Sequence, residues 1–419
     1  MNARGESVLI VGGGLIGIAA AEYLIRDGWQ VTVIDQGVIG GGCSSGNCGL
    51  VCPSHVLPLA EPGALRSAMQ AFLSRTSPLR IAARWDRSLW TWLFAFARRC
   101  NRRDMLAAAS AIQPLLTSST TEYERLFATE GFDCEWEKRG LLFAYQTPSA
   151  LDAYDKTNAL LAESFREPAT KLDATAAVAL EPALKKSIAG GWYYEHDGHL
   201  RPDRLVASWR ARLTDNGVRF VENCELKSFE ANDRTLSRAE TTCGFFQADR
   251  FLIATGAWTP KLNRWIGCDM PIQPGKGYSI TMPRPAVCPR IPLIFPEHRV
   301  AVTPMQSGYR LGSIMEFVGY DTSVHPHRLE LLRSGARPYL REPLCEPELQ
   351  PWYGWRPMTP DSLPRIGPTP RFKNLWLAAG HNMLGLSMAP ATGRLIAELF
   401  RGTTPHIDAE PYRVDRRRA

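Results

Sequence analysis

The chain has 419 residues, of which 45% are hydrophobic, and its lysines and arginines outnumber its acidic residues to give a formal net charge of +7. That length favours two domains with separate cores. The mild positive charge suits acidic substrates or an anionic surface. No dense basic groove accompanies this charge, so no nucleic-acid partner is expected. No run approaches the roughly 18 uninterrupted apolar residues that span a bilayer, and the first apolar stretch leads directly into a glycine motif, so no cleaved signal segment is expected.

A cradle for a dinucleotide is predicted at the start of the chain. The apolar run at residues 8–11 stops at Gly12-x-Gly14-x-x-Gly17, and apolar residues at helical spacing begin with Leu15 and Ile16. This order indicates a strand, a tight turn and a helix. The three glycines allow the turn, the approach of a pyrophosphate and close packing of the helix on the strand, and the helix N-terminus favours the phosphate charge.

An acidic residue completes this motif. A second apolar run at residues 31–34 ends in Asp35, which is expected to accept hydrogen bonds from ribose hydroxyls. Because no basic residue comes next, a ribose 2′-phosphate is disfavoured. We assign Asp35 and the following Gln36 to the cofactor.

Residues 37–55 are rich in glycine, serine and asparagine, which predicts a loop. The loop begins just after the acid-bearing strand, so it is expected to turn back over the cofactor, with Ser44, Ser45, Gly46 and Asn47 as contacts; a surface linker is the alternative. Three of the ten cysteines lie in this loop. Their spacing lacks a fourth ligand and matches no zinc or iron–sulfur pattern, so we expect free thiols and no metal site.

The cradle and this loop together resemble the FAD-dependent amino-acid oxidoreductases of the D-amino-acid oxidase superfamily, especially the bacterial D-amino-acid dehydrogenase branch. The similarity in the loop is carried by Ser44–Val51 and by Pro53–His55. In this family the loop lies beside the isoalloxazine ring of the flavin. The resemblance therefore implies that His55 is one of the substrate-binding residues.

Residues 80–103 combine several tryptophans and phenylalanines with a basic end. We favour a helix that packs these aromatic residues into a core. A helix that lies on anionic lipid is the alternative, since a dehydrogenase that passes electrons to quinone needs access to a membrane. A helix over Met105–Glu130 and a strand over Gly140–Tyr145 are predicted next.

The chain then returns to the cofactor domain. Asp197–Leu205 resembles the link between the two domains of the family, and for His199 we favour a structural hydrogen bond over a role as catalytic base. A buried strand is predicted from Phe251. It ends in a triplet that brings a second segment close to the dinucleotide in the family and favours FAD over NAD, namely Ala254, Thr255 and Gly256.

Residues 271–350 are rich in proline and alternate between possible strands and turns, which indicates an antiparallel sheet with one face available to a substrate. Lys276-Gly277-Tyr278 resembles the family segment that opens a strand of the substrate domain. Tyr278 is a candidate catalytic and substrate-binding residue if its phenol lies in the pocket. Packing of its ring in the core is an equal alternative.

The most distinctive stretch after the cradle is Gly354–Gly367, which resembles the family signature Gly-x-Arg-Pro-x-Thr-Pro-Asp-x-x-Pro-x-Ile-Gly. The resemblance implies that Arg356 binds the substrate α-carboxylate and is the central catalytic residue. A planar guanidinium supports this role, because it stays charged when desolvated and holds a carboxylate through two hydrogen bonds. A structural ion pair between Arg356 and Asp361 is the alternative.

The last cofactor segment is expected where a strand at residues 375–379 meets the closing helix, Met388 to Phe400, which Gly402 ends. In the family this helix N-terminus faces the pyrimidine end of the flavin, where its positive dipole stabilises the charge of the reduced ring. The residues assigned to this segment are Gly380, His381, Met383, Gly385, Leu386 and Ser387. The arginines at 416–418 are expected to form a solvated tail.

Two positions predict that FAD is bound without a covalent link. Sarcosine-oxidase relatives attach the flavin through a cysteine where this chain has Gly354. Dimethylglycine-dehydrogenase relatives use a histidine in the early loop, where the nearest match here is Gly46.

These patterns predict an α/β fold in which a Rossmann-like FAD-binding domain, residues 1–85, 191–270 and 351–419, carries an inserted antiparallel-sheet (α+β) substrate domain, residues 86–190 and 271–350. The resemblance implies oxidative deamination of a small D-amino or imino acid by hydride transfer to flavin N5, which gives an imino acid and then a 2-oxo acid. D-Proline, cis-4-hydroxy-D-proline, glycine and sarcosine are alternative substrates.

The partners implied by the resemblance are a small amino or imino acid and an electron acceptor. The dehydrogenase branch suggests a quinone or another carrier in place of oxygen, and a location in the cytoplasm or at the periphery of the inner membrane. A flavoprotein subunit of a hetero-oligomeric dehydrogenase and a tRNA-modifying FAD protein are rival functions. An NAD-dependent dehydrogenase is disfavoured, because the second and third cofactor segments fit FAD.

Overall fold

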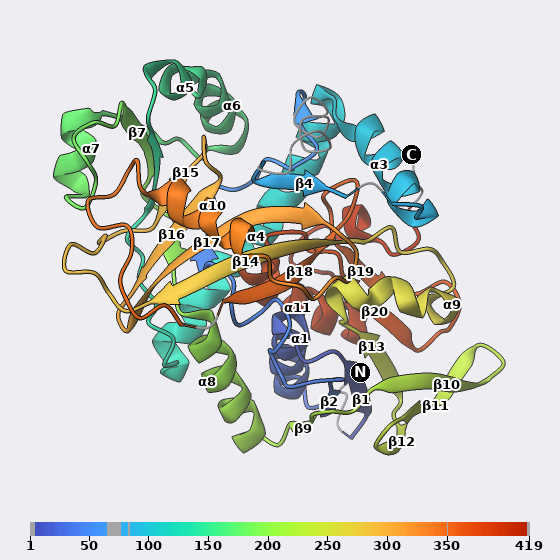
Figure 1. Cartoon of the computed structure of the whole chain (residues 1–419). Coiled ribbons are helices and arrows are strands. Elements are labelled where there is room, and N and C mark those ends of the chain that lie inside the picture. Colours follow the sequence, from blue (N-terminus) through green and yellow to red (C-terminus); the bar gives the residue numbers. More distant parts are fainter. Residues whose placement is uncertain (1–4, 65–76, 83, 350, 417–419) are drawn as a thin grey trace.

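Two large β-sheets and the helices around them organise the protein (Figure 1). The computed structural model describes residues 5–64, 77–82, 84–349 and 351–416. Each sheet takes its strands from segments scattered along the chain, so the polypeptide passes between the two sheets several times. This alternation brings distant segments to one place between the sheets.

The first sheet has six strands and begins with the predicted cradle strand. Neighbouring strands are parallel, except that β19 and β20 are antiparallel. A parallel sheet is buried on both faces, which explains why its strands read as continuous apolar runs. In spatial order the strands are β19 (Arg365–Pro368), β20 (Leu375–Ala379), β13 (Arg250–Ile253), β1 (Ser7–Val11), β2 (Gln30–Ile34) and β9 (Arg219–Val221).

Helices α1 (Leu15–Arg26) and α11 (Gly385–Arg401) pack closely against each other beside this sheet. Gly393 permits the approach, because a Cβ at this position would lie 2.4 Å from the carbonyl oxygen of Ala19. The long helix α4 (Arg102–Glu130) covers α11, and α8 (Pro202–Asp215) lies against α1. The cradle helix is therefore fixed on several sides.

The second sheet has nine strands and is mainly antiparallel. The long strands β14, β16 and β17 cross the middle of the molecule in Figure 1. In spatial order the strands are β18 (Trp352–Met358), β14 (Gln273–Met282), β17 (Gly308–Phe317), β16 (Val300–Met305), β15 (Leu293–Phe295), β5 (Leu141–Tyr145), β7 (Gly190–Tyr194) and β6 (Thr170–Asp173), with β4 (Leu79–Ile81) paired to β17.

Smaller elements complete the fold. The sheet β10 (Leu226–Asn232), β11 (Thr235–Thr241) and β12 (Gly244–Gln247) projects at one end of the molecule, and α5 (Pro148–Ala153), α6 (Asp155–Phe165) and α7 (Ala174–Leu180) lie at the opposite end (Figure 1). The others are the paired strands β3 (Leu50–Val51) and β8 (Gly198–His199), helices α3 (Arg87–Arg99), α9 (Asn263–Ile266) and α10 (Pro326–Ala336), and the 3₁₀ turns η1 (Gly256–Leu262) and η2 (Glu410–Tyr412).

The predicted α/β class and most predicted elements are confirmed, but three strands differ from the predicted domain boundaries. β4, β18 and all but the first residue of β7 lie in segments assigned to the FAD-binding domain, yet all three strands pair in the nine-stranded sheet. β18 pairs with β14 from Gln273 opposite Met358 to Ser279 opposite Trp352. Strands whose partners are so far apart in the sequence carry no local signal of their pairing. The predicted boundaries therefore assigned these strands to the FAD-binding domain.

Helix α3 contains aromatic residues for which the sequence left two environments possible, a protein core or a lipid surface. Leu89, Trp92 and Phe96 are buried, and the indole N–H of Trp92 donates to the carbonyl oxygen of Met358 at 2.8 Å. The predicted core packing is therefore confirmed for this face, while Trp90 and Phe94 are 48% and 66% exposed. No helix in the described part of the chain is both long and apolar enough to cross a membrane.

Candidate active site

A cavity of about 910 Å³ runs between the two sheets. Among the residues that line it are Ala379 from the first sheet, Gly12 directly after β1, and Gly277 and Arg356 from the second sheet. The cavity therefore reaches from the predicted dinucleotide cradle to the predicted substrate arginine.

Two cradle glycines occupy positions that exclude a side chain. Gly12 has a φ of +111°, and a Cβ there would lie 2.5 Å from the carbonyl oxygen of Ala254. At Gly17 a Cβ would lie 2.0 Å from the carbonyl oxygen of Gly12, so only glycine lets α1 sit this close to its strand. α1 also begins with no acidic residue in its first turn, which leaves its positive end available to an anion.

Asp35 lines the cavity at the end of β2 and shapes the cradle. One carboxylate oxygen accepts from the N–H of Gly13 at 2.8 Å, and the other accepts from the N–H of Gly37 at 2.9 Å. Each oxygen keeps a further acceptor site, so the carboxylate can still receive ribose hydroxyls as predicted.

Most of the predicted cofactor residues meet at this cavity. Three do not line it: Gly17 packs on Gly12, the carbonyl of Ser45 accepts from Arg310 at 3.4 Å, and Gly380 turns the chain with a φ of +84°. Gly17 thus has the packing role that its place in the motif predicted, and the contacts of these three residues with the cofactor stay a prediction. Those that line it are Gly12, Gly14, Leu15, Ile16, Asp35, Gln36, Ser44, Gly46, Asn47, Ala254, Thr255, Gly256, His381, Met383, Gly385, Leu386 and Ser387.

The loop at residues 44–48 is held from the second sheet by three polar side chains. The guanidinium of Arg310 donates to the carbonyl oxygen of Asn47 at 2.6 Å, Thr303 donates to that of Cys48 at 2.6 Å, and Ser279 donates to that of Gly46 at 2.7 Å. The sequence analysis missed these three residues. Their only local signal is a buried polar residue within an otherwise apolar strand.

The loop also contacts α1 and α11. The Ser44 hydroxyl accepts from the first helical N–H, that of Leu15, at 3.0 Å, and the Ser387 hydroxyl accepts from the N–H of Cys52 at 3.2 Å. His381 lies just before α11 with its Nε2 3.0 Å from the Thr392 hydroxyl. Burial lowers the pKa of His381 from 6.5 to about 3, so the ring is neutral at pH 7.

Arg356 reaches across from β18 to a distorted part of β17. Its two terminal nitrogens donate to the carbonyl oxygens of Ile314 at 2.9 Å and Ser313 at 3.2 Å. These residues have φ values of +31° and +104°, which are costly for residues with side chains. Burial lowers the pKa of Arg356 from its ordinary value, but a guanidinium remains charged at neutral pH.

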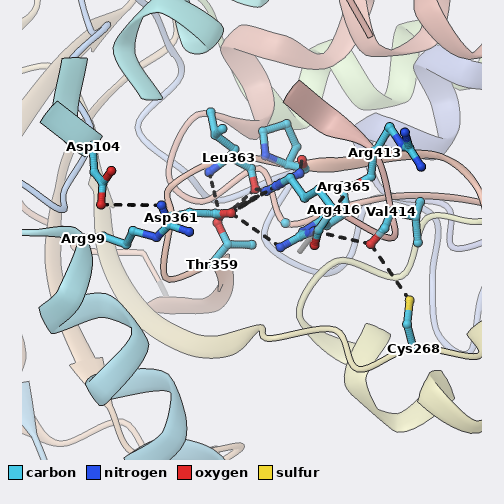
Figure 2. Close-up of polar contacts among 12 residues, drawn as sticks. Arg99, Asp104, Cys268, Thr359, Asp361, Leu363, Arg365, Arg413, Val414 and Arg416 are labelled. Atoms are coloured by element: carbon cyan, nitrogen blue, oxygen red, sulfur yellow. Dashed lines mark hydrogen bonds and ion pairs between the residues drawn. The ribbon is translucent and has the colours of Figure 1, made fainter. Parts of the chain in front are cut away.

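The alternative of an ion pair between Arg356 and Asp361 is wrong. Asp361 lies instead between Arg365, at 3.5 Å, and Arg416, at 2.9 Å (Figure 2). Within the described ranges no carboxylate oxygen lies within 4.0 Å of the Arg356 guanidinium. Arg416 is therefore not part of a solvated tail, and the other two arginines of that prediction lie outside the described residues.

Of the two alternatives for Tyr278, the structure supports packing of its ring in the core. Tyr278 borders the cavity, but its hydroxyl donates to Glu316, and its ring belongs to a buried cluster on the other side of the sheet. Successive residues of a strand face opposite sides. Gly277 faces the guanidinium of Arg356, with a notional Cβ 2.4 Å from it, so its neighbour Tyr278 faces away.

His55 lines the cavity, where the sequence placed a substrate-binding residue. Its Nδ1 lies 3.2 Å from the Ser54 hydroxyl, which donates to Asp197 at 2.6 Å. Burial lowers the pKa of His55 from 6.5 to about 4 and raises that of Asp197 from 3.8 to about 7. Cys52 joins this group, and one ligand atom each from Cys52, His55 and Asp197 lie within 4.8 Å of one another.

His199 has the structural role that the sequence favoured. Its backbone pairs with Leu50 in the β3–β8 pair and with Glu137, and its side chain is buried away from the cavity lining. The cavity wall also carries cations that the sequence analysis did not assign, namely Lys227, Lys261 and Arg264.

Comparison with known proteins identifies the family. The model of the family described as "FAD dependent oxidoreductase" matches residues 7–399. The chain belongs to this FAD-dependent oxidoreductase family. A D-amino acid dehydrogenase of Rhodopseudomonas palustris (strain HaA2) is 33% identical over 98% of this chain and 97% of its own length. One of Paramagnetospirillum magneticum is 31% identical over 98% of both.

Solved structures support the same fold. A glycine oxidase from Geobacillus kaustophilus superposes with a TM-score of 0.77 and 22% identity, covering 98% of this chain and 99% of its own. An L-proline dehydrogenase from P. horikoshii superposes with a TM-score of 0.73 and 21% identity, covering 99% of this chain and 98% of its own. The predicted Rossmann-like flavoenzyme fold is confirmed.

FAD is the cofactor of this oxidoreductase, and the cavity fits it. The glycine cradle and the free positive end of α1 suit the pyrophosphate, and Asp35 suits the ribose. α11 likewise begins without a side-chain cap or an acidic residue, and the neutral His381 precedes it, so its dipole is available to a reduced flavin. Trp352 packs against both Gly46 and Gly354, since a notional Cβ would lie 2.1 Å from its ring at Gly46 and 2.5 Å at Gly354.

Proposed function

We propose that this protein catalyses the FAD-dependent oxidative deamination of a small D-amino or imino acid. The observation that carries the proposal is Arg356, a largely buried cation in the wall of the cavity with no carboxylate partner among the described residues. A desolvated guanidinium requires an anion, and the α-carboxylate of an amino acid supplies one. Two relatives that match nearly the whole chain are named D-amino acid dehydrogenase, which supports the D configuration of the substrate.

Arg356 orients the substrate. Two of its N–H groups are fixed by the Ser313 and Ile314 carbonyls, which leaves three to bind the carboxylate. Gly277 leaves space beside the guanidinium, because any Cβ there would collide with it. Holding the carboxylate at one point fixes the α-carbon relative to the cavity and removes much of the entropic barrier.

Bound FAD supplies an acceptor for the hydride that leaves the α-carbon. The substrate reacts as the neutral amine, whose lone pair assists departure of the hydride, so the carbon–nitrogen bond becomes double without a base from the protein. Water then hydrolyses the imino acid to a 2-oxo acid, and the nitrogen leaves as ammonia or, from a cyclic imino acid, stays on the opened chain as an amine. The role of the chain is positioning and electrostatics more than acid–base catalysis.

The electron acceptor in this proposal is a quinone reached from a membrane surface. Helix α3 supports it, because Phe94 is 66% exposed and the preceding Trp85 is fully exposed, with the exposed Arg87 and Arg98 on the same segment. Aromatic and basic side chains together suit the surface of anionic lipid. Sedimentation with anionic vesicles should fall when Trp85 and Phe94 are both replaced by Ser, and equal sedimentation would contradict the membrane contact.

Anaerobic bleaching of the bound flavin tests the proposed reaction. The panel contains D- and L-amino acids with D-proline, cis-4-hydroxy-D-proline, glycine and sarcosine. We expect D-amino or D-imino acids to bleach the flavin. When an acceptor is then added, a quinone analogue should restore the colour faster than oxygen does. Bleaching by L-amino acids alone would refute the handedness, and no bleaching by any member would refute the proposed function.

A further inference from the structure

Three side chains that can bind a metal ion meet beside the cavity. One ligand atom each from Cys52, His55 and Asp197 lie within 4.8 Å of one another, and in the described part of the chain no other group of three such side chains is this compact. Cys52 and His55 line the cavity, whereas Asp197 is fully buried and does not. The fold thus brings one sulfur, one nitrogen and one oxygen donor to a single point in the cavity wall.

Local backbone structure holds these three residues together. The antiparallel pair β3–β8 sets Val51 opposite Gly198, so that Cys52 and Asp197 are the next residues on the two segments. A tight turn then brings the chain back, because the N–H of His55 donates to the carbonyl oxygen of Cys52 at 3.2 Å. The donors are therefore placed by paired backbone and by a closed turn.

Asp197 is a buried carboxylate without a cationic partner. Within the described ranges no lysine, arginine or histidine nitrogen lies within 4.0 Å of its oxygens. Its hydrogen bonds come from neutral groups, namely the N–H of Ser54 at 3.2 Å, the Ser54 hydroxyl at 2.6 Å and the Cys52 thiol. A buried carboxylate is costly unless a proton or a cation neutralises it. A metal ion at this point supplies the positive charge.

The chemistry of the donors favours zinc. Zn²⁺ accepts thiolate, imidazole and carboxylate ligands, whereas Mg²⁺ and Ca²⁺ prefer oxygen alone. One thiolate and one carboxylate balance its double charge, and binding releases the Cys52 thiol proton to solvent. Zinc–ligand bonds of about 2.0–2.3 Å place tetrahedral donors roughly 3.3–3.8 Å apart, so side-chain shifts of about 1 Å complete the coordination.

We propose that Cys52, His55 and Asp197 form a Zn²⁺ site with one coordination position open to the cavity. Three protein ligands leave a tetrahedral ion one free position, which water or a small anion fills. Two of these ligands line the cavity, so the free position faces it. Ser54 is a positioning residue, because both of its hydrogen bonds hold the Asp197 carboxylate.

The sequence analysis expected no metal site, because the loop cysteines lack a further ligand at suitable spacing. The structure combines one of those cysteines with His55 and with Asp197, which lies far along the chain. The proposed site does not depend on which amino acid the enzyme oxidises, so its failure would leave the proposed function in place.

Metal binding to the FAD-loaded protein tests the site. Co²⁺ is the first probe, because tetrahedral Co²⁺ absorbs at wavelengths beyond those of the flavin. We expect about one Co²⁺ per chain with tetrahedral bands, loss of the bands when Zn²⁺ displaces it, and a shift of the bands when azide fills the free position. Absence of tetrahedral bands would overturn the site, and bands that azide leaves unchanged would overturn the open position.

Two variants test the assigned ligands. Cys52→Ser and Asp197→Asn each remove one donor with little change of shape. Affinity for Zn²⁺, measured by competition with a chromogenic chelator, should fall by more than about a hundredfold in each, since even the outer partners of metal ligands account for roughly 10–100-fold. If Asp197→Asn fails to fold with bound FAD, Cys52→Ser decides the test.

Cys48→Ser is the matched control. Cys48 lines the same cavity but is not part of the three-residue group, so this variant should bind Zn²⁺ as the native protein does. Native affinity in Cys52→Ser would overturn the assignment. An equal loss in Cys48→Ser and Cys52→Ser would also overturn it, because the metal would then be held by the loop cysteines.

Discussion

Replacement of Arg356 is the sharpest test of the proposed chemistry. Arg356→Met keeps an unbranched side chain and removes all the donors, whereas Arg356→Lys keeps the charge but not the planar fork. Two charge-assisted hydrogen bonds to a carboxylate contribute roughly 1.5–3 kcal/mol each, about 3–6 kcal/mol together. At about 1.4 kcal/mol per factor of ten, Arg356→Met should lower kcat/KM by roughly 10²–10⁴. Arg356→Lys should retain part of the activity.

The assay measures kcat/KM with an artificial dye acceptor and the FAD content of each variant. The guanidinium also bonds the carbonyls of Ser313 and Ile314, and loss of both bonds costs about 1–3 kcal/mol of stability per buried carbonyl left unpaired. Thermal unfolding therefore has to accompany the kinetics. An Arg356→Met protein that is folded, holds FAD and keeps the native kcat/KM would refute the carboxylate role.

Three further predictions concern the cofactor and stability. Gly12→Ala should lower FAD occupancy and the unfolding midpoint far more than Gly28→Ala, because both have positive φ but only Gly12 faces a carbonyl, that of Ala254, 2.5 Å from a notional Cβ; equal effects would contradict this. The pKa of His381 is about 3 in the folded protein and 6.5 when unfolded, so its contribution to stability is complete above pH 6.5 and falls by about 1.4 kcal/mol per pH unit below it. His381→Gln should therefore flatten the decline of the melting temperature between pH 6.5 and 5, and a parallel decline would show that other groups control it. Acid precipitation should release all the flavin into the supernatant, whereas colour retained in the pellet would indicate a covalent link.

Contacts between near neighbours in the sequence were predicted most successfully. The order strand, glycines, helix and acid at residues 8–35 is local, because each element is stabilised by its own periodicity and turn residues. The same holds for the closing helix, which ends as expected before Gly402, at a φ of +68°. The role of Arg356 came from its signature, and the structure places it in the cavity as that signature implied.

The face of the sheet to which a strand residue points was harder to predict from the sequence. Tyr278 was ambiguous because a shift of one residue exchanges the two faces of a strand. β14 has an irregular register with β17 between Lys276 and Tyr278. The face of Tyr278 was thus decided by a long-range pairing that leaves no mark on the local pattern.

The sequence by itself determined the family, the cofactor and the residues that carry the cradle, since these depend on short motifs whose spacing is set by backbone geometry. Only the tertiary structure decided that Arg416, not Arg356, holds Asp361, and that Asp197 stands behind His55 although 143 residues separate it from Ser54. Such contacts form when two sheets close over one cavity and buried charges and polar groups must find partners there. Which partners they find depends on strand order and register, and these are fixed by packing of the whole chain.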